Sequence, residues 1–235
     1  MTSTTPCRAL RLPPTFDTEK LAADLARSLE TEWPSHFNTN DYAGGWTSLA
    51  LYSASGRADD IFTAPSEGYR PTPLLERCDY FREVIDSFDC PKESVRLLNL
   101  APGSVIHEHR DLKLAYEFGT FRLHVPIRTS PDVDFIVGGE NVPMEGGECW
   151  YANFDLPHSV ANRSTTPRVH LVIDGVRNAW TDELFAAAGY DFAAEERALR
   201  PDDETQRKIM AELERMDTDA SRALLKTMRD TANEG

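Results

Sequence analysis

The stretch that decides the fold is a series of short segments: VRLLNLAPG at residues 95–103, SVIHEH at 104–109, TFRLHVPIR at 120–128, DFIVGGE at 134–140, GECWYANF at 147–154, LPHSVAN at 156–162 and PRVHLVIDG at 167–175. Each is rich in aliphatic or β-branched residues, and Gly, Pro or Asn breaks separate the segments. Many short strands at such spacing indicate an all-β barrel or sandwich. No helix-length periodic segment interrupts them, so a parallel βαβ sheet is not expected.

The residues before this series favour helices, with one strand between them. Asp17 is a good N-cap, and three leucines at four-residue spacing predict a core-facing helix that ends before Pro34. A short strand is expected at 46–52, and a second helix is expected to begin with Thr72 as its cap. The chain is thus predicted to be mainly β, with a helical N-terminal part.

The tail from residue 181 to residue 235 is helical and amphipathic in pattern. We expect two parts: residues 1–180, containing the β domain with its N-terminal helices, and residues 181–235, a helical extension packed on it. The apolar stripes of the tail are predicted to support the β domain; a homodimer formed through these helices is the alternative.

Composition and charge exclude several classes of protein. The chain has 235 residues and a net charge of −14, which disfavours binding to nucleic acid or to an anionic membrane. No apolar run approaches the roughly 20 residues that a membrane-spanning helix needs, and the first residues lack the apolar core of a secretory signal. The four cysteines are scattered without a CxxC pair, so a reduced, cytoplasmic setting is expected.

The sequence His109-Arg110-Asp111 places an imidazole and a carboxylate two residues apart at the end of an apolar strand. Residues i and i+2 of a strand point to the same face, so these two side chains can chelate one metal ion. Two histidines and one carboxylate form the facial triad of non-haem Fe(II) oxygenases, and His158 after Pro157 is the best third ligand. Taken alone, the pattern is also that of an ordinary ion pair or cap at a strand end.

Three further polar residues lie in the apolar strands. Arg168 begins RVHLVID ten residues after His158, and two adjoining antiparallel strands would bring its guanidinium into the cavity of that imidazole. A buried Arg is costly unless it meets an anion, so it is a candidate carboxylate receptor; a surface Arg is the alternative. Arg122 and His124 share one strand face, which predicts a wet, ligand-holding interior, although His124 also fits a structural histidine.

Together, HRD at 109–111, RLHVPI at 122–127, the turn at Gly138-Gly139, LPHSVANRS at 156–164 and PRVHLVID at 167–174 resemble the aspartyl/asparaginyl β-hydroxylase family. This family belongs to the Fe(II)/2-oxoglutarate-dependent dioxygenases and includes bacterial cis-proline hydroxylases. The resemblance covers about residues 95–175 and continues more weakly into GWTSLALYSASG at 45–56. It implies a double-stranded β-helix, which is a jelly-roll, cupin-like barrel.

The resemblance also implies roles for individual residues. His109, Asp111 and His158 match the iron ligands, Arg168 matches the arginine that binds the far carboxylate of 2-oxoglutarate, and His124 matches a histidine that touches this co-substrate. Arg122 matches a position that contacts the carboxylate of the co-substrate or of the substrate; Arg110 and Arg163 are further candidates without motif support. No catalytic residue is expected beyond the metal ligands, and His107 is expected to be structural.

The implied reaction uses Fe(II), 2-oxoglutarate and O2 to hydroxylate a C–H bond, with succinate and CO2 as the other products. The family implies a substrate that is an amino acid, an amino-acid derivative or a peptidyl Asp or Asn, and the single-domain size favours a small soluble molecule. Asp111 points to hydroxylation, because related halogenases have a small residue in place of this carboxylate.

Two other readings stay open. A cupin-type metalloenzyme, either an isomerase or a dioxygenase that needs no 2-oxoglutarate, would use His107, His109 and His158 with a glutamate. The glutamate expected four residues after the H-x-H is Lys113, and a cupin does not need Arg168. The second reading is a non-catalytic binding member of the fold, against which the complete triad argues, because a degenerate site usually loses a ligand first.

Overall fold

The computed structural model describes residues 6–38, 40–62, 68–199 and 203–233, which divide into two units. Cys7–Asp191 form the first unit and contain every strand and the helices α1 (Thr18–Ser28), α2 (Asp79–Asp86) and α3 (Ala179–Ala187). The helices of the second unit are α4 (Phe192–Leu199), α5 (Asp203–Met216) and α6 (Asp219–Asn233).

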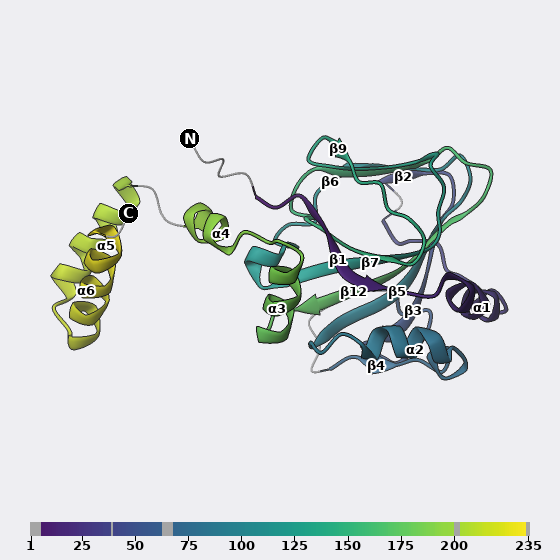
Figure 1. The fold of residues 1–235 in the computed structure, drawn as a ribbon, viewed down its shortest axis with the longest axis horizontal. Helices are drawn as coiled ribbons and strands as arrows, with labels where there is room; N and C mark the ends of the chain where they lie inside the picture. The colour runs from purple at the N-terminus through teal and green to yellow at the C-terminus, as the bar shows by residue number, and fades with distance from the viewer. Residues whose placement is uncertain (1–5, 39, 63–67, 200–202, 234–235) are drawn as a thin grey trace. The chain divides into compact units, whose positions relative to one another are not determined.

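Two antiparallel sheets face each other in the first unit (Figure 1). The larger sheet has the order β1 (Ala9–Thr15), β10 (Glu148–Ala152), β7 (Thr120–Arg128), β12 (Arg168–Val176), β5 (Lys92–Leu100), β3 (Trp46–Ser53) and β4 (Arg70–Pro71). The smaller sheet has the order β2 (Tyr42–Ala43), β6 (Val105–His109), β11 (His158–Asn162), β8 (Val133–Val137) and β9 (Glu140–Asn141).

The chain winds between these sheets as a double-stranded β-helix does. β5, β7, β10 and β12 lie in the larger sheet, and the strands that connect them in sequence, β6, β8, β9 and β11, lie in the smaller one. This alternation is that of a jelly roll. The predicted fold is confirmed, in the form of two separate sheets rather than a closed barrel.

Residues along the central strands of the larger sheet alternate between two environments. Phe121 of β7 points toward the helices, where its ring lies 5.8 Å from that of Phe185 in α3. Arg122, the next residue, points into the space between the sheets. Figure 1 shows α1 and α2 against the face of the larger sheet that is turned away from the smaller one. The sheet therefore has an apolar outer face and an inner face that carries polar side chains.

The space between the sheets also contains an apolar cluster that supports the cavity described below. Its buried members are Trp46, Leu100, Ile106, Phe135, Val137, Val142, Met144, Ala152, Phe154 and Val160. Phe135 and Phe154 belong both to this cluster and to the wall of the cavity. Close packing therefore fixes one wall of the cavity before any ligand is bound.

The local predictions for the N-terminal part hold in some places and fail in others. Asp17 caps α1 by accepting hydrogen bonds from two backbone N–H groups of the first turn, and the expected strand is β3. Strand β1, which was not predicted, precedes α1, and its Pro13 and Pro14 are tolerated because β1 lies at the edge of the larger sheet. Thr72 does not cap a helix: its hydroxyl donates to the carbonyl of Ala50 at 3.0 Å.

The second predicted helix is shorter than expected, because its predicted first part is not α-helical. A 3-10 turn at Leu75–Arg77 precedes Cys78, whose backbone dihedrals of −123° and 74° are not helical, and α2 starts only at Asp79. One apolar face does extend along this region, since Phe81, Val84 and Ile85 are buried.

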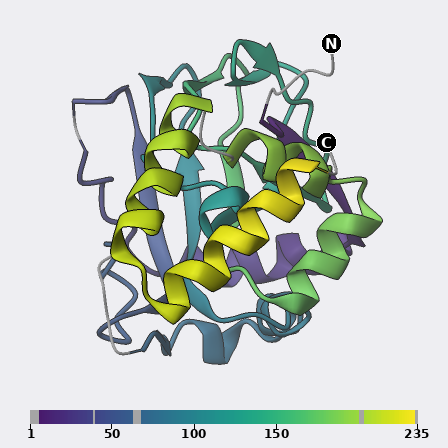
Figure 2. The same cartoon turned by 90° about the vertical axis from the view of Figure 1, so that its left-hand side faces the viewer.

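In the second unit, α5 and α6 lie side by side (Figure 2). Asp217, with a φ of 45°, stands in the turn that joins them, and Arg229 forms an ion pair with Glu214 at 2.7 Å. Packing of the tail on the β domain, the division at residue 180 and a homodimer through the tail stay predictions. Within the described ranges, no helix has both the length and the apolar character needed to cross a membrane.

Candidate active site

Three potential metal-binding side chains converge at the end of strand β6. The ligating atoms of His109, Asp111 and His158 all lie within 4.8 Å of one another. The pairing of β6 with β11 sets His158 directly opposite His109, and their ring centroids are 4.2 Å apart. The register of the smaller sheet thus brings together two histidines that are 49 positions apart in the sequence.

Asp111 reaches this group from a turn rather than from a strand. β6 ends at His109, and the backbone N–H of Asp111 donates to the carbonyl of Phe154 at 3.0 Å. The strand alternation expected from the sequence is therefore not what directs the carboxylate. A backbone hydrogen bond to the segment that precedes His158 holds it next to both imidazoles.

The two imidazoles are oriented by backbone carbonyls. Nδ1 of His109 donates to the carbonyl of His107 at 2.8 Å, and Nδ1 of His158 donates to the carbonyl of Leu156 at 3.0 Å. A carbonyl only accepts, so Nδ1 carries the proton and Nε2 presents its lone pair. Burial lowers the pKa of His158 to about 4, so this imidazole is neutral and able to bind a metal.

Asp111 is held in its anionic form. Nη1 of Arg122 donates to its Oδ2 at 2.8 Å. Burial works against the charged carboxylate, but the positive charge of Arg122 outweighs it and lowers the pKa of Asp111. Two imidazoles that present Nε2 and one carboxylate are the donor set that suits a non-haem ferrous ion, so the residues fit the metal that the fold class implies.

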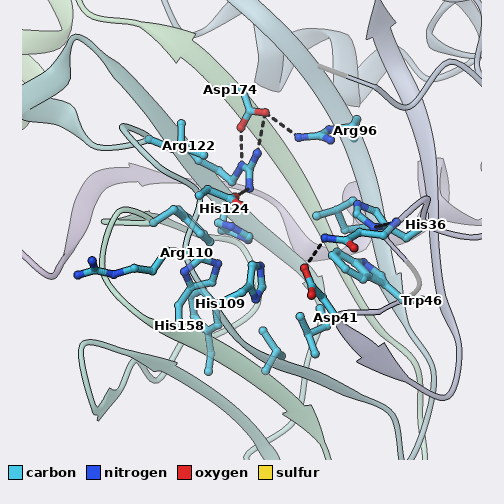
Figure 3. A pocket seen from close by; sticks show the side chains of 18 of the residues that line it. His36, Asp41, Trp46, Arg96, His109, Arg110, Arg122, His124, His158 and Asp174 are labelled. Carbon is cyan, nitrogen blue, oxygen red and sulfur yellow. Dashed lines mark hydrogen bonds and ion pairs between the residues drawn. The ribbon is translucent and has the colours of Figure 1, made fainter. Parts of the chain in front are cut away.

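A cavity of about 480 Å³ lies in front of these three side chains (Figure 3). Arg122, His124 and Arg168 also line it. β12, which carries Arg168, lies in the larger sheet, and β11, which carries His158, lies in the smaller one. The two residues therefore line the cavity from different sheets, and do not lie on adjoining strands as expected.

Arg168 is a buried cation without an anion. Only 3% of it is exposed, and its Nε and one terminal nitrogen have no hydrogen-bond partner. Among the described residues no carboxylate pairs with it, and its guanidinium instead lies over the ring of Phe135 at 5.6 Å. Burial lowers the pKa of Arg168 to about 9, so the side chain is still charged at neutral pH. Such a group calls for an anionic ligand.

Two buried histidines accompany this arginine. His124 and His170 face each other through their Nδ1 atoms at 3.2 Å, and the Nε2 atom of each is buried without a hydrogen-bond partner among the residues that the structure describes. Burial, reinforced by the charge of Arg168, lowers the pKa of both residues well below the usual value, so both are neutral. Arg168 and the Nε2 atoms of His124 and His170 therefore have hydrogen-bonding capacity that no group of the described residues uses.

Arg96, Asp111, Arg122 and Asp174 form a network of charged residues near the end of β12 that is far from Arg168. Asp174 binds Arg122 through both oxygens, at 2.6 Å to Nε and 3.0 Å to Nη2, and it accepts from Arg96 at 2.6 Å. Burial opposes ionisation of this carboxylate, but Arg122 and Arg96 outweigh it and lower the pKa of Asp174. Two guanidinium groups thus share one carboxylate, and Arg122 links that carboxylate to Asp111.

The remaining sequence candidates lie elsewhere or at the margin. Arg110 lines the cavity but is exposed. Arg163 is absent from the cavity wall and pairs with Asp134 at 2.7 Å. The side chain of His107 is exposed and lies outside the metal-binding group, and only its carbonyl contributes, by orienting His109.

Several cavity residues escaped the sequence analysis, among them Asp174, Arg96, His36 and Asp41. Asp174 could have been found from the sequence, because it lies six residues after Arg168 in the same predicted strand and so shares its face. Arg96 requires the register of β5 against β12, which the sequence does not state. His36 and Asp41 lie in a segment without strand or helix periodicity.

Comparison with known proteins agrees with this geometry. Residues 16–178 match the family model described as aspartyl/asparaginyl beta-hydroxylase. L-proline cis-4-hydroxylase from Rhizobium meliloti (strain 1021) is 31% identical over 173 residues, which are 72% of this chain and 61% of that enzyme. The chain therefore matches less than two thirds of the length of this relative.

Solved structures show more distant likenesses. An oxidoreductase of the 2OG-Fe(II) oxygenase family from Burkholderia pseudomallei has a TM-score of 0.49 and 14% identity, over 72% of this chain and 86% of that one. A prolyl-4-hydroxylase from Pseudomonas putida has a TM-score of 0.44 and 14% identity, over 72% and 92%. These two likenesses are too remote to bear on the chemistry of the site. The family match covers every strand of the two sheets except β1 and includes all three residues of the metal-binding group, and the chain belongs to the aspartyl/asparaginyl β-hydroxylase family.

Proposed function

We propose that this protein is an Fe(II)- and 2-oxoglutarate-dependent dioxygenase that hydroxylates a C–H bond of a small amino acid or amino-acid derivative. One observation carries the proposal: a His-Asp-His group and a buried, unpaired arginine line the same cavity. Family membership and the likeness to a proline hydroxylase support it. Four free thiols support a cytoplasmic setting, because disulfides are rare there.

His109, Asp111 and His158 would hold the iron, through Nε2 of each imidazole and a carboxylate oxygen of Asp111. The carbonyls behind both Nδ1 atoms keep the imidazoles in the tautomer that binds metal. Iron with 2-oxoglutarate and oxygen supplies the oxidising chemistry, whose products are the hydroxylated substrate, succinate and CO2. The protein contributes geometry, charge complementarity and a cavity partly walled by apolar side chains.

Arg168 would bind the far carboxylate of 2-oxoglutarate. Its fork of N–H groups matches a carboxylate, and no carboxylate in the described part of the chain pairs with it. His124 would add a second donor: when Nδ1 of His170 donates to Nδ1 of His124, Nε2 of His124 carries the proton and can donate to the co-substrate. The neutral state of His124 avoids a second buried positive charge beside Arg168.

Arg122 would bind a carboxylate of the substrate. Arg96 and Arg122 together carry two positive charges, and the carboxylate they share, that of Asp174, supplies one negative charge. Asp111 also faces Arg122, but its charge would be drawn to the iron. This part of the cavity therefore retains a positive charge that an amino-acid carboxylate would neutralise.

Succinate release from 2-oxoglutarate, measured with ferrous iron across the proteinogenic amino acids and their derivatives, tests the proposal. We expect release that depends on one amino acid and is matched by a hydroxylated product of 16 Da greater mass. Metal-dependent conversion that needs no 2-oxoglutarate would favour a cupin-type enzyme. Binding of 2-oxoglutarate without turnover of any amino acid would favour a non-catalytic member of the fold.

A further inference from the structure

The charged groups of the cavity form two sets: a guanidinium cluster built around one carboxylate, and a carboxylate that stands apart from it. Arg96, Arg122 and Asp174 lie together on the inner face of the larger sheet, whereas the Asp41 carboxylate enters from another side (Figure 3). Asp41 belongs to the segment before β3, from which His36, Phe37, Asn38 and Asp41 line the cavity. This separation bears on the kind of substrate that fits.

The segment that carries Asp41 is fastened on both sides. The N–H of His36 donates to the carbonyl of Trp46 in β3 at 2.8 Å, and the carbonyl of Asp41 accepts from the N–H of His107 in β6 at 2.7 Å. The ring of His36 also stacks on that of Trp46, with centroids 3.5 Å apart. Asp41 is therefore attached to the strand that ends at His109, one of the three metal-binding residues.

Gly44 is required for this arrangement. Its φ is +94°, and a Cβ atom on it would meet Oγ of Ser104 at 2.3 Å. The hydroxyl of Ser104 accepts from the N–H of Gly45 at 2.8 Å, so the close approach is part of the fold. The wall segment is thus preorganised, and Asp41 keeps its position without a ligand.

The Asp41 carboxylate has no positive partner among the described residues. The side-chain amide of Asn38 donates to its Oδ2 and fixes its orientation, but an amide carries no charge. No Lys, Arg or His of the described chain pairs with Asp41, although Arg122 and Arg110 line the same cavity. One cavity therefore offers both a cluster with excess positive charge and a separate carboxylate with no counter-ion.

We propose that Asp41 binds the free ammonium group of an amino-acid substrate whose carboxylate lies on Arg122. The inference rests on the proposed function and narrows it: the substrate is a zwitterion with an unblocked primary or secondary amine. An N-acylated amino acid or a residue inside a peptide has no such charge, and its uncharged amide would leave the charge of the half-buried Asp41 carboxylate without a counter-ion.

Glu93 is the other carboxylate to consider, because it also lines the cavity. Burial and the negative charge of Asp174 raise the pKa of Glu93, so its charged form, which an ammonium group needs, is disfavoured. Asp41 stands apart from Arg96, Arg122 and Asp174 in Figure 3 and is the stronger candidate.

The test compares Asp41→Asn with Asp132→Asn, which removes one negative charge at an exposed position outside the cavity wall. The ligands are the amino acid that gives the most succinate in the screen above and its N-acetyl derivative. We expect Asp41→Asn to raise the KM for the amino acid at least tenfold and to leave the KM for 2-oxoglutarate unchanged. Calorimetric binding of the amino acid to protein loaded with Ni(II) and 2-oxoglutarate should weaken by the same factor. Asp132→Asn should match the wild type in both measurements.

Three results would overturn the inference: an unchanged KM in Asp41→Asn, equal use of the N-acetyl derivative by the wild type, or a loss of affinity in Glu93→Gln that Asp41→Asn does not show. Failure of the proposed function looks different. In that case the wild type itself releases no succinate with any amino acid and binds none to the Ni(II) form.

Discussion

Arg122 joins two carboxylates on opposite sides of its guanidinium: it binds both oxygens of Asp174 and also donates to Oδ2 of Asp111 at 2.8 Å. Asp174 therefore determines where Arg122 points, and Arg122 in turn determines which oxygen of Asp111 is engaged. A residue deep in the larger sheet is connected in this way to the group that would hold the metal.

Replacing Asp174 with Asn should destabilise the protein strongly. The carboxylate is 2% exposed and is the shared partner of Arg96 and Arg122, so its loss leaves the buried Arg96 without its anion and Arg122 with Asp111 alone. Removing one partner of a buried ion pair typically costs about 3 to 5 kcal/mol. Urea unfolding of the metal-free protein should show a loss of unfolding free energy in this range.

Asp134→Asn is the matched control for Asp174→Asn, because Asp134 pairs with Arg163 at the surface. Exposed pairs contribute about 0 to 1 kcal/mol, so this variant should unfold close to the wild type. If Asp174→Asn lost no more stability than Asp134→Asn, the guanidinium groups would have to find other anions, and the network would not fix Arg122.

Metal binding should depend on Asp111 and not on His107. Asp111 lies within 4.8 Å of both ligating imidazoles, whereas the His107 side chain is exposed and outside this group. We expect Ni(II) to raise the melting temperature of the wild type and of His107→Ala alike, since a ligand that binds only the folded state stabilises it. Asp111→Ala should lose most of this increase.

The reverse pattern in these melting curves would contradict the assignment. Loss of the Ni(II) effect in His107→Ala, with the effect retained in Asp111→Ala, would mean that an H-x-H pair binds the metal, as in a cupin. His107→Ala removes only the side chain and keeps the backbone carbonyl that orients His109. The variant therefore tests the His107 imidazole alone.

The β fold and the members of the site were predictable because their signals are local. Short apolar strands with Gly and Pro breaks identify a two-sheet fold, and all six residues singled out from motifs line one cavity. Their roles stay proposals. Strand β1 escaped prediction because two prolines argue against a strand unless it is known to lie at an edge.

What the sequence could not provide is the relation between strands. Arg96 reaches Asp174 because β5 and β12 pair in a register that sets Val172 beside Arg96 and Asp174 beside Ser94. Asp41 becomes part of the cavity through a backbone hydrogen bond to His107, and no side-chain pattern reports such a bond. Pairing partners and loop paths are tertiary properties, and propensity and periodicity do not contain them.

Arg168→Met should separate ligand binding from folding. In the free protein Arg168 is a buried charge without an anion, so methionine, which is similar in length and uncharged, should leave unfolding free energy unchanged or raise it. Binding of 2-oxoglutarate to the Ni(II) form should weaken about 100-fold, as expected when a charged hydrogen-bonding partner is lost. Unfolding curves and calorimetry measure the two effects. A large destabilisation of the metal-free variant would show that the guanidinium is already satisfied.

His36 should make stability depend on pH between about 6.5 and 4. Burial, together with the charges of Arg96 and Arg122, lowers its pKa to about 4, whereas the unfolded chain has the ordinary value near 6.5. The unfolded state therefore binds more protons in this window, and the contribution of His36 is complete above pH 6.5 and decreases as the pH falls toward 4. Between pH 7 and pH 5 the loss is at most about 2 kcal/mol, and about half of this with screening by water in the cavity. Urea unfolding of the wild type and of His36→Gln at both pH values isolates this term, since the glutamine variant should lose less stability over the same interval. Equal losses in the two proteins would mean that His36 accepts its proton in the folded state as readily as in the unfolded chain, and that the stacked ring between Trp46 and Phe37 does not hold it neutral.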